Sequence, residues 1–272
     1  MLFYPLYALL FADAGLSTAQ ISSLFAIWCA VSFAFEVPSG AWADTFSRRR
    51  LVTTGAVVRA AGFLSWAVWP TYAGFALGFA CWAFSSAVSS GAQEALLYDE
   101  LAAVGEESRY TAVTARAETV AMLAMLAASV LATPVLALGG YGLIAAGSVL
   151  VCLGGAATAL AFPETPRAVQ ADGDGLRAYV RNLRAGLGEV RRVRLVRRAV
   201  VVTAAVASLS ALDEYVSLLV RDAGVAVVGV PLAMAVVMGA MAAGSAGAER
   251  WPGVRPARIG AAVGVAGVCL GV

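Results

Sequence analysis

A short charged stretch divides two long apolar segments of this chain: Glu36-Val-Pro-Ser-Gly40-Ala-Trp-Ala-Asp44-Thr-Phe-Ser-Arg48-Arg49-Arg50. An apolar segment of about 20 residues crosses a bilayer as a helix. Arginines at the end of such a segment favour the cytoplasmic side, because positively charged connections resist translocation. The stretch therefore predicts a membrane protein whose second and third spans are joined on the cytoplasmic side.

The composition of the whole chain excludes most soluble classes. Of its 272 residues, 61% are apolar and only 13% are charged, and the mean hydropathy is +0.82. A soluble domain of this length needs a more highly charged surface. The chain contains neither lysine nor histidine, so it lacks the usual general base and the Gly-x-x-x-x-Gly-Lys loop of ATP-driven proteins. Its four cysteines have no metal-ligand spacing. We predict a polytopic all-α protein that is not an enzyme and has no cofactor or metal.

Hydropathy divides the chain into nine apolar segments, of which seven are long enough to span a bilayer. A segment of ~12 to 15 residues rises only ~18 to 23 Å, less than the ~30 Å hydrocarbon layer. The first and last segments are that short, so we expect both ends of the chain to lie inside a span, as in a fragment. The segments are 1–12, 20–42, 51–70, 72–97, 112–136, 141–162, 199–220, 225–247 and 258–272.

The arginines test this topology independently, because they were not used to draw the spans. They fall in alternate connections or beside them, at 48–59, 109–116, 167–198 and 250–258, and only Arg221 lies on the other side. Positively charged connections face the cytoplasm. The pattern therefore predicts a multi-pass protein whose N-terminus is inside.

The connection 163–198 is long, basic and amphipathic. Its apolar residues recur every three or four positions, at Leu176, Val180, Leu183 and Leu187, with arginines around them. Such a helix lies at the membrane surface. It acts either as a tether between two bundles or as a regulatory segment.

The order of the spans predicts a duplicated architecture. We expect an N-terminal six-helix bundle at 1–162 with an incomplete first helix, the linker at 163–198, and a partial C-terminal bundle at 199–272. The segment 7–16 recurs in outline at 215–225, with matching tyrosine, aspartate and glycine positions, as expected for an internal repeat.

Aromatic residues mark the outer end of the third span. Trp66 and Trp69 lie near that end and Tyr72 lies just beyond it. Tryptophan and tyrosine are enriched where a membrane meets water. We interpret these residues as interfacial anchors.

The charged stretch resembles a known signature. Gly40, Asp44, Arg48 and Arg49 are similar to the Gly-x-x-x-Asp-Arg-x-Gly-Arg-Arg signature of the major facilitator superfamily, although other residues replace the basic residue and the second glycine that follow the aspartate. The preceding Glu36-Val-Pro-Ser and the later stretch 90–101, Ser-Gly-Ala-Gln-Glu-Ala-Leu-Leu-Tyr-Asp-Glu-Leu, look like bacterial efflux members. The family normally has twelve helices, so the chain resembles its first two thirds.

The residues of this stretch have a role that can be argued from their chemistry. A glycine at position 40 permits close approach of a neighbouring helix. Asp44 can accept bonds from a helix N-terminus or pair with Arg48 or Arg49. The resemblance implies a cytoplasmic gate between two bundles that stabilises the outward-facing state. The alternative is a solvated charge cluster that only orients the chain.

Ionisable residues inside spans are further candidates, because a buried charge is rarely idle. Glu94 and Asp99 lie near the inner end of the fourth span, and Arg116 and Glu118 lie about two turns into the fifth. We expect Glu94 or Asp99 to approach Arg116, either as an inner gate or as a structural ion pair.

Three further residues are candidates for coupling. Asp213 and Glu214 lie about two turns inside the outer end of the seventh span. There they would load and release a proton, or they would pair with Arg221 in a wet vestibule. Arg59 replaces the fourth-span arginine of proton-coupled relatives, or it extends to the inner surface.

Together these patterns predict a secondary transporter. We expect proton-coupled efflux of a small, partly hydrophobic molecule by alternating access, as an antiporter in a bacterial plasma (inner) membrane. The expected partners are the substrate, protons and the lipid bilayer, with no nucleic acid, and the expected state is a monomer. The alternative is a non-transporting remnant or a helical scaffold protein.

Overall fold

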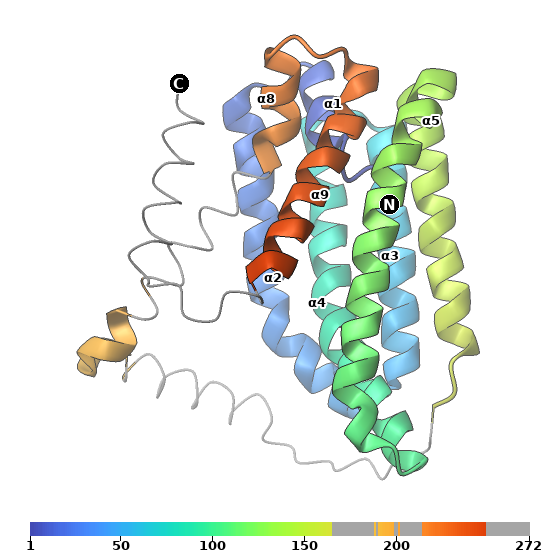
Figure 1. Ribbon diagram of the computed structural model, residues 1–272, viewed down its shortest axis with the longest axis vertical. Helices are drawn as coiled ribbons and strands as arrows, with labels where there is room; N and C mark the ends of the chain where they lie inside the picture. The colour runs from blue at the N-terminus through green and yellow to red at the C-terminus, as the bar shows by residue number, and fades with distance from the viewer. Residues whose placement is uncertain (165–187, 189, 199–200, 202–213, 249–272) are drawn as a thin grey trace. The chain divides into compact units, whose positions relative to one another are not determined.

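The computed structural model describes residues 1–164, 188, 190–198, 201 and 214–248. Within these residues the chain forms α-helices and short 3-10 helices, and no strand (Figure 1). The chain divides into two compact units, Met1–Met234 and Ala235–Val272. The amphipathic helix expected within 163–198 and the span expected at 258–272 lie outside the described residues or almost entirely so.

The first unit begins with four helices. They are α1 (Tyr7–Asp13), α2 (Thr18–Thr45), α3 (Arg48–Val68) and α4 (Tyr72–Ala103). A hydroxyl side chain caps the start of each of the last three, from Ser17, Ser47 and Thr71 respectively, and thereby satisfies a backbone N–H that has no partner within the helix. The helices contain most of the spans expected at 20–42, 51–70 and 72–97, and each extends a few residues beyond the expected cytoplasmic end.

The short helix η1 (Glu107–Arg109) is followed by α5 (Tyr110–Ala161). Helix α5 consists of two helical arms joined by a sharp turn. The helix reverses direction at Gly139 and Gly140 (Figure 1). Gly140 has φ 59° and ψ −157°, a conformation that is essentially restricted to glycine. The arms, 110–138 and 141–161, correspond to the two spans expected at 112–136 and 141–162.

Among the described residues, four helical stretches are long and apolar enough to cross a membrane: Thr18–Glu36, Arg48–Val68, Tyr72–Ala103 and Glu107–Ala161. The last of them contains the reversal. The prediction of an all-α protein with several apolar membrane helices is therefore confirmed.

The repeat expected from the sequence has a structural counterpart. The described part of the predicted seventh span contains α8 (Val216–Asp222), followed by η3 (Val227–Gly229) and α9 (Val230–Ala248). A glycine with positive φ lies two residues after the end of each of α1 and α8, with φ 87° at Gly15 and 91° at Gly224. In both turns the glycine N–H donates to the carbonyl three residues earlier at 2.9 Å. The two matching sequences thus form the same local structure.

Helices α3 and α4 pack closely through glycines. A Cβ atom added to Gly62 would lie 2.9 Å from the carbonyl oxygen of Gly78 and 2.9 Å from Cβ of Cys81. Small residues at such crossings let two backbones approach. Gly40 behaves differently: its position is exposed, and a Cβ atom added there would have no neighbour within 4 Å in the described structure. Among the described residues the close helix packing lies at the α3–α4 contact, and the close approach predicted at Gly40 stays a prediction.

An aromatic cluster forms a large part of the core of the first unit. Phe11 and Phe75 lie with ring centroids 4.4 Å apart, and Trp66 packs edge-on against Phe11 at 5.2 Å. Trp66 is completely buried and donates its indole N–H to the carbonyl of Phe75 at 3.2 Å. The prediction that Trp66 is an interfacial anchor is wrong, since its side chain faces the other helices. Trp69, by contrast, is 49% exposed.

Candidate functional site

Arg48 holds three helices together at the end of the unit where α3 begins, which the sequence predicts to face the cytoplasm. Its guanidinium forms an ion pair with Asp99 of α4. It also donates to the carbonyl of Ala95 at 2.7 Å and, through Nε, to the carbonyl of Ala43 of α2 at 3.2 Å. The Arg48 side chain is only 12% exposed, whereas Asp99 is 40% exposed. One side chain at the start of α3 therefore joins α2, α3 and α4.

Glu164, which follows α5, binds the start of the same helix. The Ser47 hydroxyl donates to Glu164 Oε2 at 2.5 Å, and the backbone N–H of Arg49 donates to Oε1 at 3.4 Å. Arg49 also approaches Glu164 with Nε 3.9 Å from Oε2 and donates to the carbonyl of Phe162 at 3.2 Å. A carboxylate is favourable here because a helix N-terminus carries partial positive charge. We call Ser47, Arg48, Arg49, Asp99 and Glu164 the inner cluster.

The inner cluster changes the acidity of Glu164. Partial burial opposes its ionisation, but the hydrogen bond from Ser47 and those from the backbone N–H groups of Arg49 and Arg48 favour the charged form. The Arg49 charge adds to them, and the net effect lowers the pKa of Glu164 below its usual value. The ionised carboxylate therefore stabilises the folded protein.

This lowered pKa predicts a pH-dependent contribution to stability. The contribution is complete above the unfolded pKa of about 4.3 and is lost as the pH falls through the lower folded pKa. At pH 7 we expect Glu164→Gln to reduce the free energy of unfolding by about 1 kcal/mol, as for loss of a helix cap. Thermal unfolding in detergent from pH 7 to pH 3 should show the variant and the parent converging in acid. The exposed Glu107→Gln is the control, and a constant difference between Glu164→Gln and the parent would contradict the assignment.

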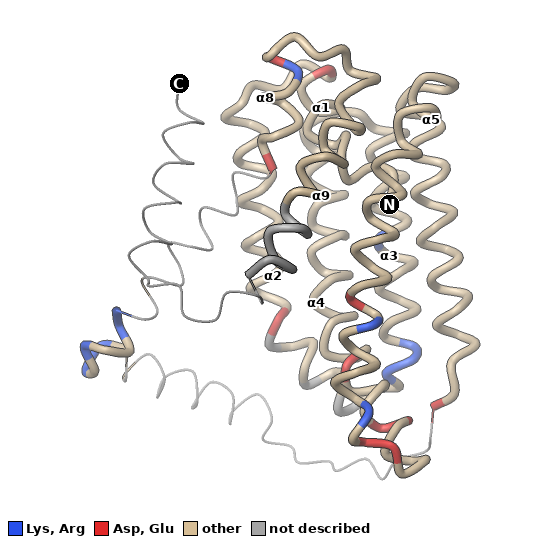
Figure 2. Tube along the Cα trace, in the orientation of Figure 1, with Lys and Arg blue, Asp and Glu red and all other residues tan. Residues whose placement is uncertain are grey.

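A second polar group lies at the opposite end of the unit. Arg221 of α8 donates to Asp13 Oδ1 of α1 at 2.9 Å, and the Tyr141 hydroxyl donates to Asp13 Oδ2 at 2.6 Å. Beside them, the hydroxyl oxygens of Ser22 in α2 and Tyr215 lie 2.7 Å apart. We call Asp13, Ser22, Tyr141, Tyr215 and Arg221 the outer cluster. Figure 2 shows charged positions gathered toward both ends of the helices.

The structure describes the side-chain contacts of only some of the residues in the predicted gate. Arg48 and Arg49 contact α2, α4 and the segment after α5, which belong to the predicted first bundle and to the start of the predicted linker. The Asp44 side chain lies outside the described residues, so its pairing stays a prediction. Glu36 is exposed, and its carbonyl accepts a bond from the Ser39 hydroxyl at 2.9 Å.

The expected approach of Arg116 to Glu94 or Asp99 is wrong. Asp99 pairs with Arg48, whereas Arg116 has an exposed side chain and makes no ion pair with either carboxylate in the described structure. Glu94 and Glu118 are also exposed. The reason is helix rotation: Asp99 lies on the face of α4 that meets the start of α3.

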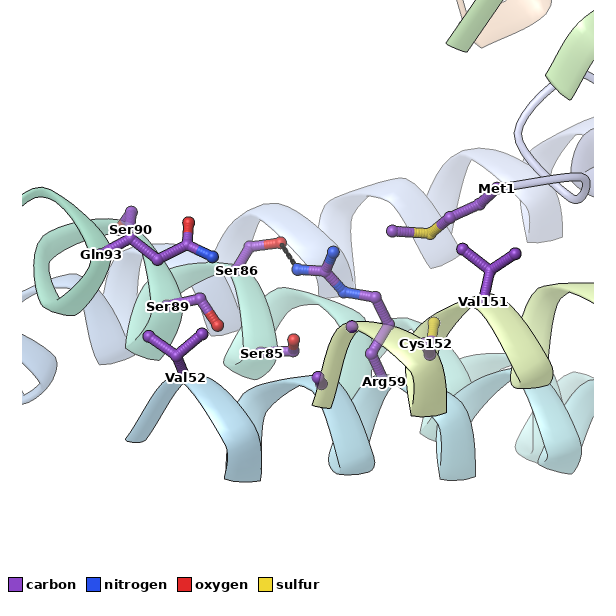
Figure 3. Close-up of a pocket in the computed structure, with 12 residues that line it drawn as sticks. Met1, Val52, Arg59, Ser85, Ser86, Ser89, Ser90, Gln93, Val151 and Cys152 are labelled. Carbon is purple, nitrogen blue, oxygen red and sulfur yellow. Dashed lines mark hydrogen bonds between the residues drawn. The ribbon is translucent and has the colours of Figure 1, made fainter. Parts of the chain in front are cut away.

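The remaining candidates lie elsewhere. Asp213 is outside the described residues, and Glu214 is half-buried. Arg221 pairs with Asp13, which differs from the vestibule pairing considered for Asp213 and Glu214. Arg59 lies beside a cavity and donates to the Ser86 hydroxyl at 3.2 Å (Figure 3).

Sequence reasoning missed Asp13, Tyr141 and Glu164 as members of a site. A signal for Asp13 was present, since the internal repeat brings it into correspondence with the segment that contains Arg221. Glu164 had no such signal, because it lies in a loop without periodicity. Among the described residues, no group of three or more Cys, Asp and Glu side chains is placed to hold a metal ion.

Comparison of the sequence with models of known protein families gives a match. The family model described as Major Facilitator Superfamily matches residues 1–272. A search of curated proteins and a search of solved structures found no match. The matched region contains the inner cluster, the outer cluster and the cavity beside Arg59.

Proposed function

This chain belongs to the Major Facilitator Superfamily and is a membrane transporter of that type, and we propose that it exports a small, partly hydrophobic molecule in exchange for protons. The proposed location is a bacterial plasma membrane, and the proposed state is a monomer. The division into a first bundle at 1–162, a linker at 163–198 and a second bundle from 199 onward belongs to the same proposal. The mechanism is alternating access, in which two bundles rock about a site near the midplane.

The observation that carries this proposal is the pair between Asp13 and Arg221 at 2.9 Å. It joins α1 of the first bundle to α8, the corresponding helix of the proposed second bundle. The hydroxyl pair of Ser22 and Tyr215 adds a second connection. Both close the outer end, and both must break when the bundles separate on that side. Their side chains are partly exposed, so water can replace the lost bonds and the contacts are reversible.

The inner cluster supports the half of the transport cycle in which the cytoplasmic side is closed. We assign the cytoplasmic gate to Gly40, Asp44, Arg48 and Arg49. In this proposal Arg48 and Arg49 hold the inner ends of α2, α3 and α4 as one rigid surface, and Asp44 meets the second bundle when the cytoplasmic side closes. Asp99 acts in gating by pairing with Arg48.

Other charged residues have gating or coupling roles in this proposal. The residues to which we give a gating or coupling role are Glu36, Arg59, Glu94, Arg116 and Glu118. Proton coupling itself is assigned to Asp213 and Glu214, because carboxylates inside a span can load and release protons. The half-buried position of Glu214 is compatible with that role.

Coupled flux in vesicles tests the proposal. The protein is reconstituted with a pH gradient, and movement of ethidium or benzoate is followed together with internal pH. We expect the parent to couple the two fluxes and Asp213→Asn or Glu214→Gln to abolish the coupling. Asp222→Asn, an exposed neighbour in the same segment, is the matched control. Coupling that survives both changes would remove the role assigned to this pair, and a parent that moves neither probe would favour the scaffold alternative.

A further inference from the structure

The Asp13 carboxylate accepts two hydrogen bonds, one on each of its oxygens. Arg221 of α8 donates to Oδ1 at 2.9 Å, and the Tyr141 hydroxyl donates to Oδ2 at 2.6 Å. The second distance is typical of a hydroxyl bonded to a carboxylate, a charge-assisted contact that is stronger than a bond between neutral groups. Because each donor has its own oxygen, both bonds form at the same time.

The two donors belong to different halves of the proposed transporter. Tyr141 begins the second arm of α5, and α5 and α1 both lie in the proposed first bundle. Arg221 lies in α8, near the start of the proposed second bundle. When the outer end opens, Arg221 therefore leaves Asp13, whereas Tyr141 stays beside it. The hydroxyl of Tyr141 is the donor that Asp13 keeps in both states.

Tyr141 is fixed by the turn that precedes it and by the helix that follows it. The reversal of α5 ends at Gly140, whose backbone conformation is essentially restricted to glycine. Ile144 and Ala145, one turn further along the second arm, are buried. The Tyr141 ring packs against the core of the first unit, and a tyrosine side chain has only two rotatable bonds that move the ring. Its hydroxyl is therefore held in one place.

Asp13 has fewer constraints of its own. It is the last residue of α1, and its side chain is 38% exposed. An exposed carboxylate adopts several rotamers, and fixing one of them costs entropy each time an ion pair forms. The bond from Tyr141 reduces that cost in advance, because it orients the carboxylate before Arg221 arrives.

We propose that Tyr141 is a positioning residue, which holds Asp13 ready for Arg221 and thereby determines how firmly the outer end closes. The inference rests on the proposed closure of the outer end by Asp13 and Arg221. It adds to that closure a donor from the first bundle itself. Tyr141 acts through Asp13, and it strengthens the ion pair by pre-organising one of the two partners.

The test measures how often the outer end opens. The complete 272-residue chain is reconstituted in vesicles, with its four cysteines replaced by alanine and a reporter cysteine at Ser217 of α8, which is buried. An impermeant thiol reagent added outside should modify this cysteine faster when the outer end opens more often. We expect labelling to be roughly tenfold faster in Arg221→Gln and roughly three- to tenfold faster in Tyr141→Phe, as for the loss of a hydrogen bond to a charged group.

A double variant separates positioning from simple packing. Tyr141→Phe should have no further effect when Arg221→Gln is already present, because Asp13 then has no partner to be held for. A residue that only stabilised the bundle would change the labelling rate equally with and without Arg221. The matched control is Tyr72→Phe, which removes a hydroxyl pair with Ser23 at 2.9 Å and leaves both bonds of Asp13 in place. It should label at the parent rate.

The outcomes for closure and for positioning are distinct. Labelling of Arg221→Gln at the parent rate would contradict the outer closure and the positioning role together. Faster labelling of Arg221→Gln, combined with parent-like or slower labelling of Tyr141→Phe, would overturn the positioning role alone. Equal acceleration by Tyr141→Phe with and without Arg221 would do the same. If Tyr141→Phe fails to elute as a single peak, Tyr141→Met, which also lacks the hydroxyl, replaces it under the same criteria.

Discussion

Cross-linking position 13 to position 221 is expected to reduce transport to the background level. Asp13 and Arg221 pair at 2.9 Å between α1 and α8, so the two helices must separate at this end when the outer side opens. Cysteines at both positions, joined by a short thiol-reactive cross-linker, would hold that end closed. The background protein has alanine in place of its four cysteines, Cys29, Cys81, Cys152 and Cys269. The measurement is coupled flux of ethidium or benzoate in vesicles.

The cross-link has clear controls. Each single-cysteine variant treated with the same reagent should retain its flux, which separates bridging from simple modification. Reduction of a cleavable cross-linker should restore flux in the double variant. Parent-like flux with positions 13 and 221 bridged would contradict outer closure by this pair. Arg221→Gln alone should have the opposite effect and open the outer end. In a Ser22→Cys background, the introduced thiol should then react faster with an impermeant reagent added from outside than it does with Arg221 present.

The second large effect is expected from Arg48→Gln. The change removes the ion pair with Asp99 and the bonds to the carbonyls of Ala43 and Ala95. Breaking a buried pair is strongly destabilising, but Asp99 is 40% exposed, so solvent reduces the loss to about 2 kcal/mol. We expect flux to fall at least tenfold, because the inner ends of α2, α3 and α4 would no longer form the single surface that the proposed gate requires.

Thermal unfolding and vesicle flux both measure the effect of Arg48→Gln. Arg50→Gln is the matched control, since Arg50 is its exposed neighbour on the same helix. Arg48→Lys should be intermediate, because one ammonium group cannot reach the carboxylate and both carbonyls with the geometry of a guanidinium. If Arg48→Gln unfolds at the parent temperature and transports at the parent rate, Arg48 has neither the structural nor the gating role assigned here.

The sequence alone was enough to determine the membrane class and the bounds of most described helices. These properties are local. A helix that crosses lipid must satisfy its backbone hydrogen bonds internally and must be apolar over about 20 residues, and both requirements are visible within one segment. The helix starts at Ser17, Ser47 and Thr71 are similarly local, because a cap binds an amide only a few positions away. The repeat of α1 in α8 was visible for the same reason.

Only the tertiary structure decided which side chains meet. Ser47 and Glu164 are 117 positions apart, and Asp13 and Arg221 are 208 positions apart. Helical periodicity shows which residues share a face, but it does not show which helix that face meets. The same limitation explains the wrong predictions for Trp66 and for Arg116, whose surroundings depend on how the helices are rotated and packed. Pairing across a bundle is a property of the assembled helices, so it follows from their packing and not from any one segment.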